Sequence, residues 1–182
     1  MIKRVDKRVI QNFVVEKREI GKTDQEIYTE LTKRYNDKKS IAIIITGTPT
    51  KSDKAKYKIY NYILIYTLAI SVILRLLGFV SVALNEHNTY SLFLLILIPL
   101  IPFYFIREIY RYNAGIYPVC GLLYIATSIN AITEPKSGID AIINLVFVLI
   151  IGGLTFFLYK KLFPKYSPRK LKKNTSGDYI LN

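Results

Sequence analysis

Residues 60–84 read YNYILIYTLAISVILRLLGFVSVAL, a run of 25 residues with one charged side chain, Arg75. About 20 helical residues cross the roughly 30 Å of hydrocarbon in a bilayer, so this run predicts a transmembrane helix. Three more segments have the length and composition to cross: residues 90–106, 114–132 and 141–158. Each must be helical if it spans, because a lone strand would leave its backbone polar groups unpaired in lipid. The sequence therefore predicts an all-α integral membrane protein with a four-helix transmembrane bundle.

The basic residues lie almost entirely on one side of these four spans. Residues 1–59 hold 15 lysines and arginines, the loop 107–113 holds two, and the chain from residue 159 onward holds seven. The two opposite loops together hold one, Lys136. By the positive-inside rule this asymmetry predicts a multi-pass protein with both termini cytoplasmic. A re-entrant third segment is the alternative, and it would leave three crossings and place the basic tail on the opposite side.

Residues 1–50 are predicted to form a small, mainly helical cytoplasmic subdomain, followed by the transmembrane domain (51–158) and a basic cytoplasmic tail (159–182). Thr23 stands three residues before Glu26, which fits a capping box, and apolar residues follow on one helical face. We therefore expect an amphipathic helix over residues 24–35. Residues 9–14 also share a helical face, but their β-branched content leaves helix and strand both open.

Two further segments precede the first span. Residues 40–46, SIAIIIT, are too short to cross a membrane, and periodicity leaves a buried strand, a core helix and an interfacial segment all open. Thr50 and Asp53 give a second match to the capping box just after Pro49. This match predicts one continuous helix from about Lys51 through the first span.

Arg75 is the sharpest single feature of the sequence. An arginine at the centre of a spanning helix costs about 2.5 to 3.5 kcal/mol on insertion scales. Its side chain could reach the outer headgroups, line an aqueous path, or fix helix contacts through backbone carbonyls and the side chains of Asn130 and Asn144. We take Arg75, Asn130 and Asn144 as candidate pore or helix-contact residues.

Small and polar residues gather in the third and fourth predicted spans and indicate close helix packing within the bundle or between copies. They are Gly115, Cys120, Gly121, Ala126, Thr127, Ser128, Asn130, Ala131, Gly152 and Gly153.

The tail after the fourth span is strongly basic, and its residues are candidate contacts for anionic lipid headgroups: Lys160, Lys161, Lys165, Arg169, Lys170, Lys172 and Lys173. Nucleic acid is an alternative anionic partner, but no recognisable RNA- or DNA-binding module accompanies these residues.

Catalytic and metal-binding patterns are absent from the sequence. It holds one cysteine, Cys120, and one histidine, His87, so a thiolate metal site lacks its residues. No hydrolase or metalloprotease motif occurs. We therefore expect no enzyme activity, no cofactor and no bound metal.

Three functions remain as hypotheses. The first is a non-enzymatic membrane anchor or assembly component whose N-terminal region binds a cytoplasmic partner and which forms a homo-oligomer or joins a membrane complex. The second is a homo-oligomeric channel or pore-forming effector with Arg75 lining the path. The third and least supported is a lipid-modifying enzyme at the membrane interface, resting on interfacial tyrosines and His87.

Overall fold

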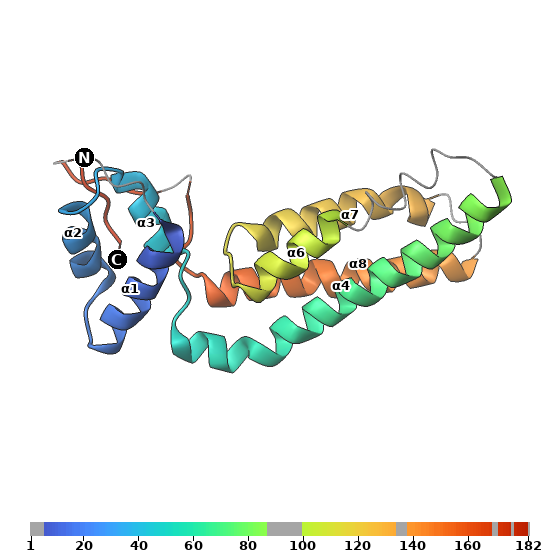
Figure 1. Cartoon of the computed structure of the whole chain (residues 1–182), viewed down its shortest axis with the longest axis horizontal. Coiled ribbons are helices and arrows are strands. Elements are labelled where there is room, and N and C mark those ends of the chain that lie inside the picture. Colours follow the sequence, from blue (N-terminus) through green and yellow to red (C-terminus); the bar gives the residue numbers. More distant parts are fainter. Residues whose placement is uncertain (1–5, 87–99, 134–137, 169–170, 176, 182) are drawn as a thin grey trace. The chain divides into compact units, whose positions relative to one another are not determined.

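The computed structural model describes residues 6–86, 100–133, 138–168, 171–175 and 177–181. These residues form seven helices and no strands, so the predicted all-α class is confirmed. The helices are α1 (Lys7–Glu19), α2 (Asp24–Thr32), α3 (Lys38–Thr46), α4 (Lys51–Glu86), α6 (Leu100–Tyr110), α7 (Ile116–Thr133) and α8 (Gly138–Leu162) (Figure 1).

The chain divides into two compact units. The first, which we call the terminal unit, consists of Met1–Lys56 and Lys160–Asn182, so the two ends of the chain fold together. The second, the central unit, is Tyr57–Tyr159. Figure 1 shows both termini in the terminal unit, beside α1, α2 and α3.

The terminal unit has one hydrophobic core, drawn from α1, α2, α3 and the last residues of the chain. Its buried members are Ile10, Val14, Ile27, Tyr28, Leu31, Ile41, Ala42, Ile44, Ile45, Tyr179 and Leu181. The predicted apolar face of residues 24–35 is confirmed by its buried residues on α2, although α2 ends at Thr32 rather than at residue 35. Residues 9–14 and 40–46, left open by the sequence, are both helical and both contribute to this core.

Side-chain caps explain where the short helices begin. The hydroxyl of Thr23 accepts a hydrogen bond from the N–H of Glu26, and the Glu26 carboxylate accepts one from the N–H of Thr23, which confirms the predicted capping box. Asp6 caps α1 and Asp37 caps α3 in a similar way. Each cap satisfies amide groups that the first helical turn leaves without a partner.

The end of the chain forms a tight turn that packs onto α2. Gly177 has φ +78° and allows the reversal, after which the N–H of Ile180 donates to the carbonyl of Lys172 at 3.0 Å. The amide side chain of Gln25 then binds the backbone on both sides of Ile180, donating to the carbonyl of Tyr179 at 3.2 Å and accepting from the N–H of Leu181 at 2.9 Å. This contact was not predicted, because residues 159–182 were assigned to a separate tail.

Helix α4 runs unbroken from Lys51 to Glu86, so the predicted continuous helix through the first span is confirmed. At its start the Thr50 hydroxyl donates to the Asp53 carboxylate at 2.7 Å and accepts from the N–H of Asp53 at 3.0 Å. An α-helix rises about 1.5 Å per residue, so α4 and α8 are both longer than the hydrocarbon core of a bilayer.

Two segments are long and apolar enough to cross a membrane, Lys51–Leu77 of α4 and Ala141–Leu162 of α8, and this favours a membrane location. The four-span bundle is not confirmed. Residues 90–99 of the second predicted span lie outside the described residues, and α6 has only 11 residues. In the third predicted span, Ile116–Ala126 is a shorter apolar helix.

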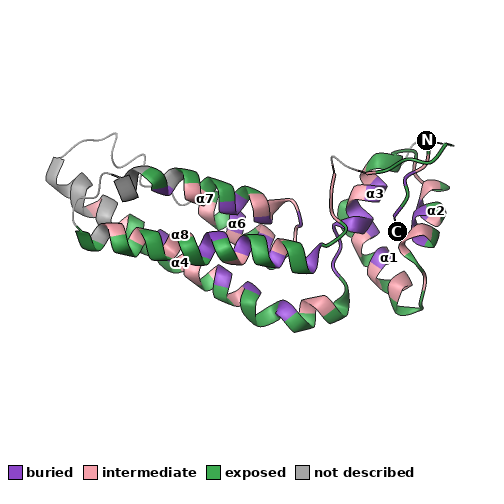
Figure 2. Ribbon diagram, turned by 180° about the vertical axis from the view of Figure 1, so that it is seen from behind, coloured by how far each residue is buried: buried purple, intermediate pink, exposed green. Residues whose placement is uncertain are grey.

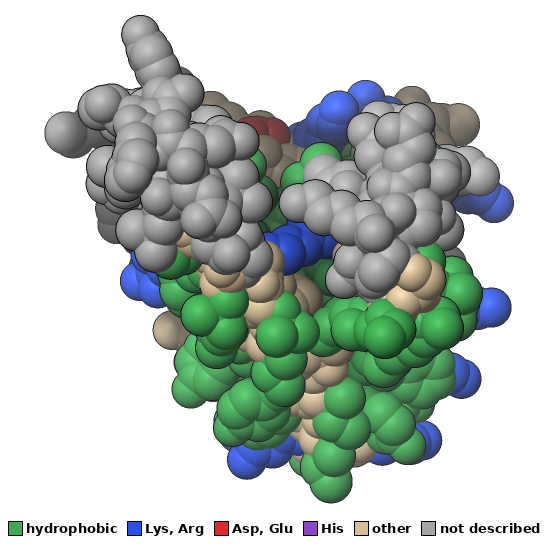
Figure 3. Space-filling view, turned by 90° about the vertical axis from the view of Figure 1, so that its right-hand side faces the viewer, with side chains coloured by type: hydrophobic (Ala, Val, Ile, Leu, Met, Phe, Trp, Pro, Cys, Tyr) green, Lys and Arg blue, Asp and Glu red, His purple; other side chains and the backbone are tan. Residues whose placement is uncertain are grey.

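The apolar surfaces of α4 and α8 are largely exposed, since only 28% of the first candidate span and 22% of the second are buried within the chain (Figure 2). Large hydrophobic side chains such as Ile59, Tyr66, Leu77, Ile142 and Leu149 stand on their outer faces. Figure 3 shows hydrophobic side chains over most of the described surface in that view. Soluble monomers rarely expose contiguous apolar patches beyond a few hundred Å², so this surface is typical of one covered by lipid or by partners.

Candidate functional site: a polar cavity and an arginine cavity

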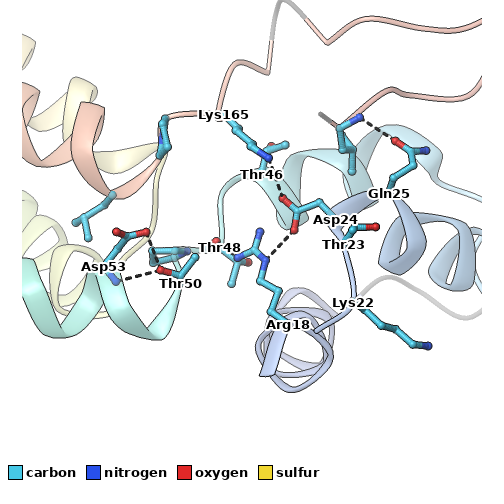
Figure 4. Close-up of a pocket in the computed structure, with 14 residues that line it drawn as sticks. Arg18, Lys22, Thr23, Asp24, Gln25, Thr46, Thr48, Thr50, Asp53 and Lys165 are labelled. Carbon is cyan, nitrogen blue, oxygen red and sulfur yellow. Dashed lines mark hydrogen bonds and ion pairs between the residues drawn. The ribbon is translucent and has the colours of Figure 1, made fainter. Parts of the chain in front are cut away.

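The larger of the two described cavities, about 490 Å³, lies in the terminal unit, and we call it the polar cavity (Figure 4). Its lining comes from the end of α1, the start of α2, the segment joining α3 to α4, and the chain after α8. The lining residues are Arg18, Lys22, Thr23, Asp24, Gln25, Thr46, Thr48, Pro49, Thr50, Asp53, Leu162, Pro164, Lys165 and Leu181. Its volume falls in the range of about 300 to 1,000 Å³ that small-molecule sites occupy.

Arg18 holds the walls of this cavity together. Its Nε donates to Asp24 Oδ1 at 2.8 Å, Nη1 donates to the carbonyl of Thr48 at 2.5 Å, and Nη2 donates to the carbonyl of Ile45 at 3.1 Å. One guanidinium thus connects α1 to the first residue of α2 and to the end of α3. A guanidinium has five N–H donors, so two remain for other acceptors.

The other charged side chains of the cavity are less tightly held. Lys165 Nζ lies 4.0 Å from Asp24 Oδ2, and 52% of its side chain is exposed. In Figure 4, Asp53 and Thr50 lie on one side and Arg18 and Asp24 on the other. Among the described residues, no cation lies within 4.0 Å of the Asp53 carboxylate. Lys22 points away and pairs with Glu30 at 2.8 Å.

Local hydrogen bonds lower the pKa of two glutamates on α2. The backbone N–H of Thr23 holds the pKa of Glu26 below its usual value, and the Thr23 hydroxyl adds to the effect. A hydrogen bond from Lys22 lowers the pKa of Glu30. The Glu26 contact fixes the start of α2, and the Glu30 contact joins Lys22 to the second half of the same helix.

Arg75 borders the second cavity, about 150 Å³, which lies in the central unit and which we call the arginine cavity. Its Nη2 donates to the Ser128 hydroxyl at 3.0 Å, and its guanidinium carbon lies 4.8 Å from the centre of the Tyr124 ring. Both partners belong to α7. The walls are otherwise mainly apolar and include Leu68, Val72, Ile101, Pro102, Phe105 and Leu123.

These contacts bear on what the Arg75 side chain binds within the chain. Arg75 is joined to α7 by its hydrogen bond to Ser128, and a role for Arg75, Asn130 and Asn144 in a pore or a helix contact stays a prediction. Asn130 lies in α7, its side chain outside the described set, and Asn144 is half-buried on α8. Ser128 was noted in the sequence only as a small polar residue, and nothing in the sequence paired it with Arg75.

The basic tail residues are separated by the fold. Lys160 and Lys161 are exposed in the last turn of α8, Lys165 lines the polar cavity, and Lys172 and Lys173 are exposed in the terminal turn. Arg169 and Lys170 lie outside the described residues, as does His87. The ammonium of Lys173 lies 5.2 Å from the centre of the Tyr179 ring.

Close contacts within one chain join the central helices. The Tyr117 hydroxyl donates to Asn61 Oδ1 at 2.7 Å, and Asn61 Nδ2 donates to the carbonyl of Ile109 at 3.3 Å, so one buried network ties α4, α6 and α7 together. A Cβ added at Gly121 on α7 would lie 2.4 Å from the Thr155 hydroxyl on α8. Gly121 is therefore needed for packing inside a single chain.

The described residues contain no group of three histidines, cysteines, aspartates or glutamates placed to hold a metal ion. The lining of the polar cavity includes three cations, of which Lys22 pairs with Glu30, and two carboxylates, which suits binding of a ligand that carries both charges. No protein-family model, curated protein or solved structure matches this chain.

Proposed function

We propose that this protein is a multi-pass integral membrane protein, with both termini in the cytoplasm, that acts as a non-enzymatic anchor or assembly component. The terminal unit would be its partner-binding region. The observation that carries the proposal is the shared core, in which Tyr179 and Leu181 are buried against α1, α2 and α3.

A shared core constrains the topology. The chain leaves the terminal unit after Lys56 and returns to it at Lys160. Two segments of one folded unit must lie on the same side of a membrane, so the chain between them has to cross an even number of times. This supports two or four crossings over the three that a re-entrant third segment would leave, and the 24-to-1 distribution of basic residues favours the cytoplasm for the terminal unit.

Cysteine labelling of the full chain tests this topology. In a Cys120→Ala background, single cysteines would be introduced at Lys39 in α3 and at Gly138 at the start of α8, both exposed. In sealed right-side-out vesicles we expect a membrane-impermeant maleimide to label Gly138→Cys directly and Lys39→Cys only after lysis. Labelling of both positions, or of Lys39→Cys alone, before lysis would overturn the proposed orientation.

The helix contacts within one chain limit which small residues are left for self-association. Gly121 and Gly152 face side chains of the same chain, Thr155 and Ile125 respectively, whereas Gly153 has no heavy atom within 4 Å of its Cβ position. We therefore place the contact between copies on the face of α8 that carries Gly153. Light scattering of the purified protein should show a defined oligomer, which Gly153→Leu shifts toward the monomer. A wild-type monomer would remove this contact.

A homo-oligomeric channel is the second candidate, because Arg75 remains exposed in the single chain while contacting Tyr124 and Ser128. Copies arranged around this residue would place a cation along an aqueous path, which favours anions. Planar-bilayer recordings before and after Arg75→Ala test the channel, and absence of conductance at high protein density would exclude it. The lipid-modifying enzyme has the least support, since it rests on interfacial tyrosines and on His87, which lies outside the described residues.

A further inference from the structure

The polar cavity lies at the start of α4 and at the end of α8, the two longest apolar helices. Thr50 directly precedes α4 and Asp53 lies in its first turn, whereas Leu162 is the last residue of α8 and Pro164 and Lys165 follow it. On the proposed topology, the hydrocarbon core ends on the cytoplasmic side at about residue 60 of α4 and residue 158 of α8, so Asp53 and Leu162 lie about 10 Å or less along their helices from that boundary. The cavity therefore lies at the level of the lipid headgroups of the inner leaflet. This step rests on the proposed function.

The threonine hydroxyls of the cavity are already engaged within the protein. Thr46 donates to the carbonyl of Ala42 at 2.9 Å, and Thr48 donates to the carbonyl of Ile44 at 2.7 Å. Thr50 donates to Asp53 at 2.7 Å. A ligand consequently meets the charged groups of the cavity as its main hydrogen-bonding partners.

Those charged groups form a basic site and an acidic site on opposite sides of the cavity. Arg18 keeps two N–H donors beyond the three that bind Asp24, Thr48 and Ile45, and the Lys165 ammonium lies 4.0 Å from Asp24. Together they form a site for an anion such as a phosphate. Asp53, on the other side of the cavity, keeps one carboxylate oxygen that no described residue contacts (Figure 4). It forms a site for a cation that can donate hydrogen bonds.

We propose that the polar cavity binds a phospholipid headgroup that joins a phosphate diester to a primary amine, as in phosphoethanolamine. Arg18 and Lys165 hold the phosphate, and Asp53 accepts hydrogen bonds from the ammonium. A headgroup with a phosphate but no amine brings no positive charge to the Asp53 carboxylate, which makes its binding weaker. A trimethylated amine has no N–H to donate to Asp53. This selectivity differs from the general attraction of a basic tail to anionic lipids.

Native mass spectrometry of the full chain in detergent tests the proposal with three short-chain lipids that share their acyl chains and carry phosphoethanolamine, phosphocholine or phosphoglycerol. We expect the phosphoethanolamine lipid to bind about tenfold more tightly than the other two, because one charge-assisted hydrogen bond is worth roughly this factor. Asp53→Asn should remove the preference, and Lys165→Gln should weaken binding of all three lipids. Glu16→Gln and Lys172→Gln change exposed charges outside the cavity and should leave binding unchanged.

Three results would overturn the proposal: equal binding of the three lipids by the wild type, tightest binding of the phosphoglycerol lipid regardless of Asp53, or a preference that survives Asp53→Asn. Free glycerophosphoethanolamine separates a lipid from a soluble source, and binding of this compound as tight as that of the lipid would exclude the membrane as the source. Because Asp53 also caps α4, circular dichroism has to show unchanged helicity, and Asp53→Glu should retain the preference. The cysteine labelling above tests the topology independently.

Discussion

Replacing Arg18 by glutamine should selectively destabilise the terminal unit. The substitution removes a hydrogen-bonded ion pair to Asp24 and two hydrogen bonds to the carbonyls of Thr48 and Ile45. The Arg18 and Asp24 side chains are 18% and 12% exposed, so Asp24 would lose its main partner in a poorly solvated position. Removing one partner of a fully buried ion pair costs about 3 to 5 kcal/mol, and the partial exposure here reduces the expected cost to about 2 to 4 kcal/mol.

This cost is large relative to the size of the unit. Domains have about 0.05 to 0.15 kcal/mol of stability per residue, so the terminal unit has roughly 4 to 12 kcal/mol in total. Hydrogen exchange of the full chain in detergent, followed by mass spectrometry, measures the change in each segment. A loss of 2 kcal/mol corresponds to roughly 30-fold faster exchange for amides that open with the unit, since each 1.4 kcal/mol is about tenfold. Peptides from α1, α2 and α3 should show it.

Arg34→Gln is the matched control. Arg34 also pairs with a carboxylate, Glu30 at 3.1 Å, but 60% of its side chain is exposed and its partner is one helical turn away. Such pairs contribute about 0.3 to 0.5 kcal/mol, so exchange should change about twofold. The reasoning is refuted if Arg18→Gln accelerates exchange no more than Arg34→Gln, or if the central unit loses protection to the same extent as the terminal unit.

Three further substitutions test separate parts of the fold. Leu181→Ala should cost about 2 to 5 kcal/mol because Leu181 is buried in the terminal core, and limited proteolysis should then cleave the end of the chain and α2 faster, whereas Ile180→Ala should have little effect. Gly121→Ala should lower the thermal midpoint of the detergent-solubilised protein by the equivalent of about 1 to 3 kcal/mol because its Cβ meets Thr155, and an unchanged midpoint would contradict the close approach of α7 and α8. Hydrogen bonds from the Ser40 hydroxyl and N–H hold the pKa of Asp37 below its ordinary value, so its contribution to stability is present above that ordinary value and is lost as the pH falls through the lowered one. Ser40→Ala should raise the pKa of Asp37 in an NMR titration, and an unchanged pKa would show that the cap does not act through Ser40.

Local signals in the sequence predicted local structure well. The spacing of Thr23 and Glu26 predicted the start of α2, and Thr50 with Asp53 predicted the start of α4, because a cap involves residues only three apart. The choice between helix and strand for residues 40–46 stayed open because an apolar run of seven residues fits both. Contacts with the core decide it, since α3 buries four apolar side chains, Ile41, Ala42, Ile44 and Ile45.

Contacts between distant parts of the chain were not predictable in the same way. Gln25 and Leu181 are 156 residues apart, and neither residue type indicates the other. The available signal was the apolar sequence Tyr179-Ile180-Leu181 at the end of a polar tail, placed just after a glycine that permits a turn. The same holds for Arg75. The free-energy cost of an arginine in a spanning helix indicated that it has a partner but could not identify Ser128.

The basic residues of the terminal unit have two distinct physical roles. Arg18, Lys22, Lys38 and Lys51 each pair with a carboxylate of the same unit, so their charges contribute to folding. Lys160, Lys161 and Lys172 are exposed and have no described ion pair, so their charges remain available to a membrane surface. An excess of basic residues at the ends of a chain is therefore not a direct measure of attraction to anionic lipid. The shared core and the charge asymmetry depend on different residues, and both favour the same side of the membrane for the two ends of the chain. Together they support an even number of crossings more strongly than either observation alone.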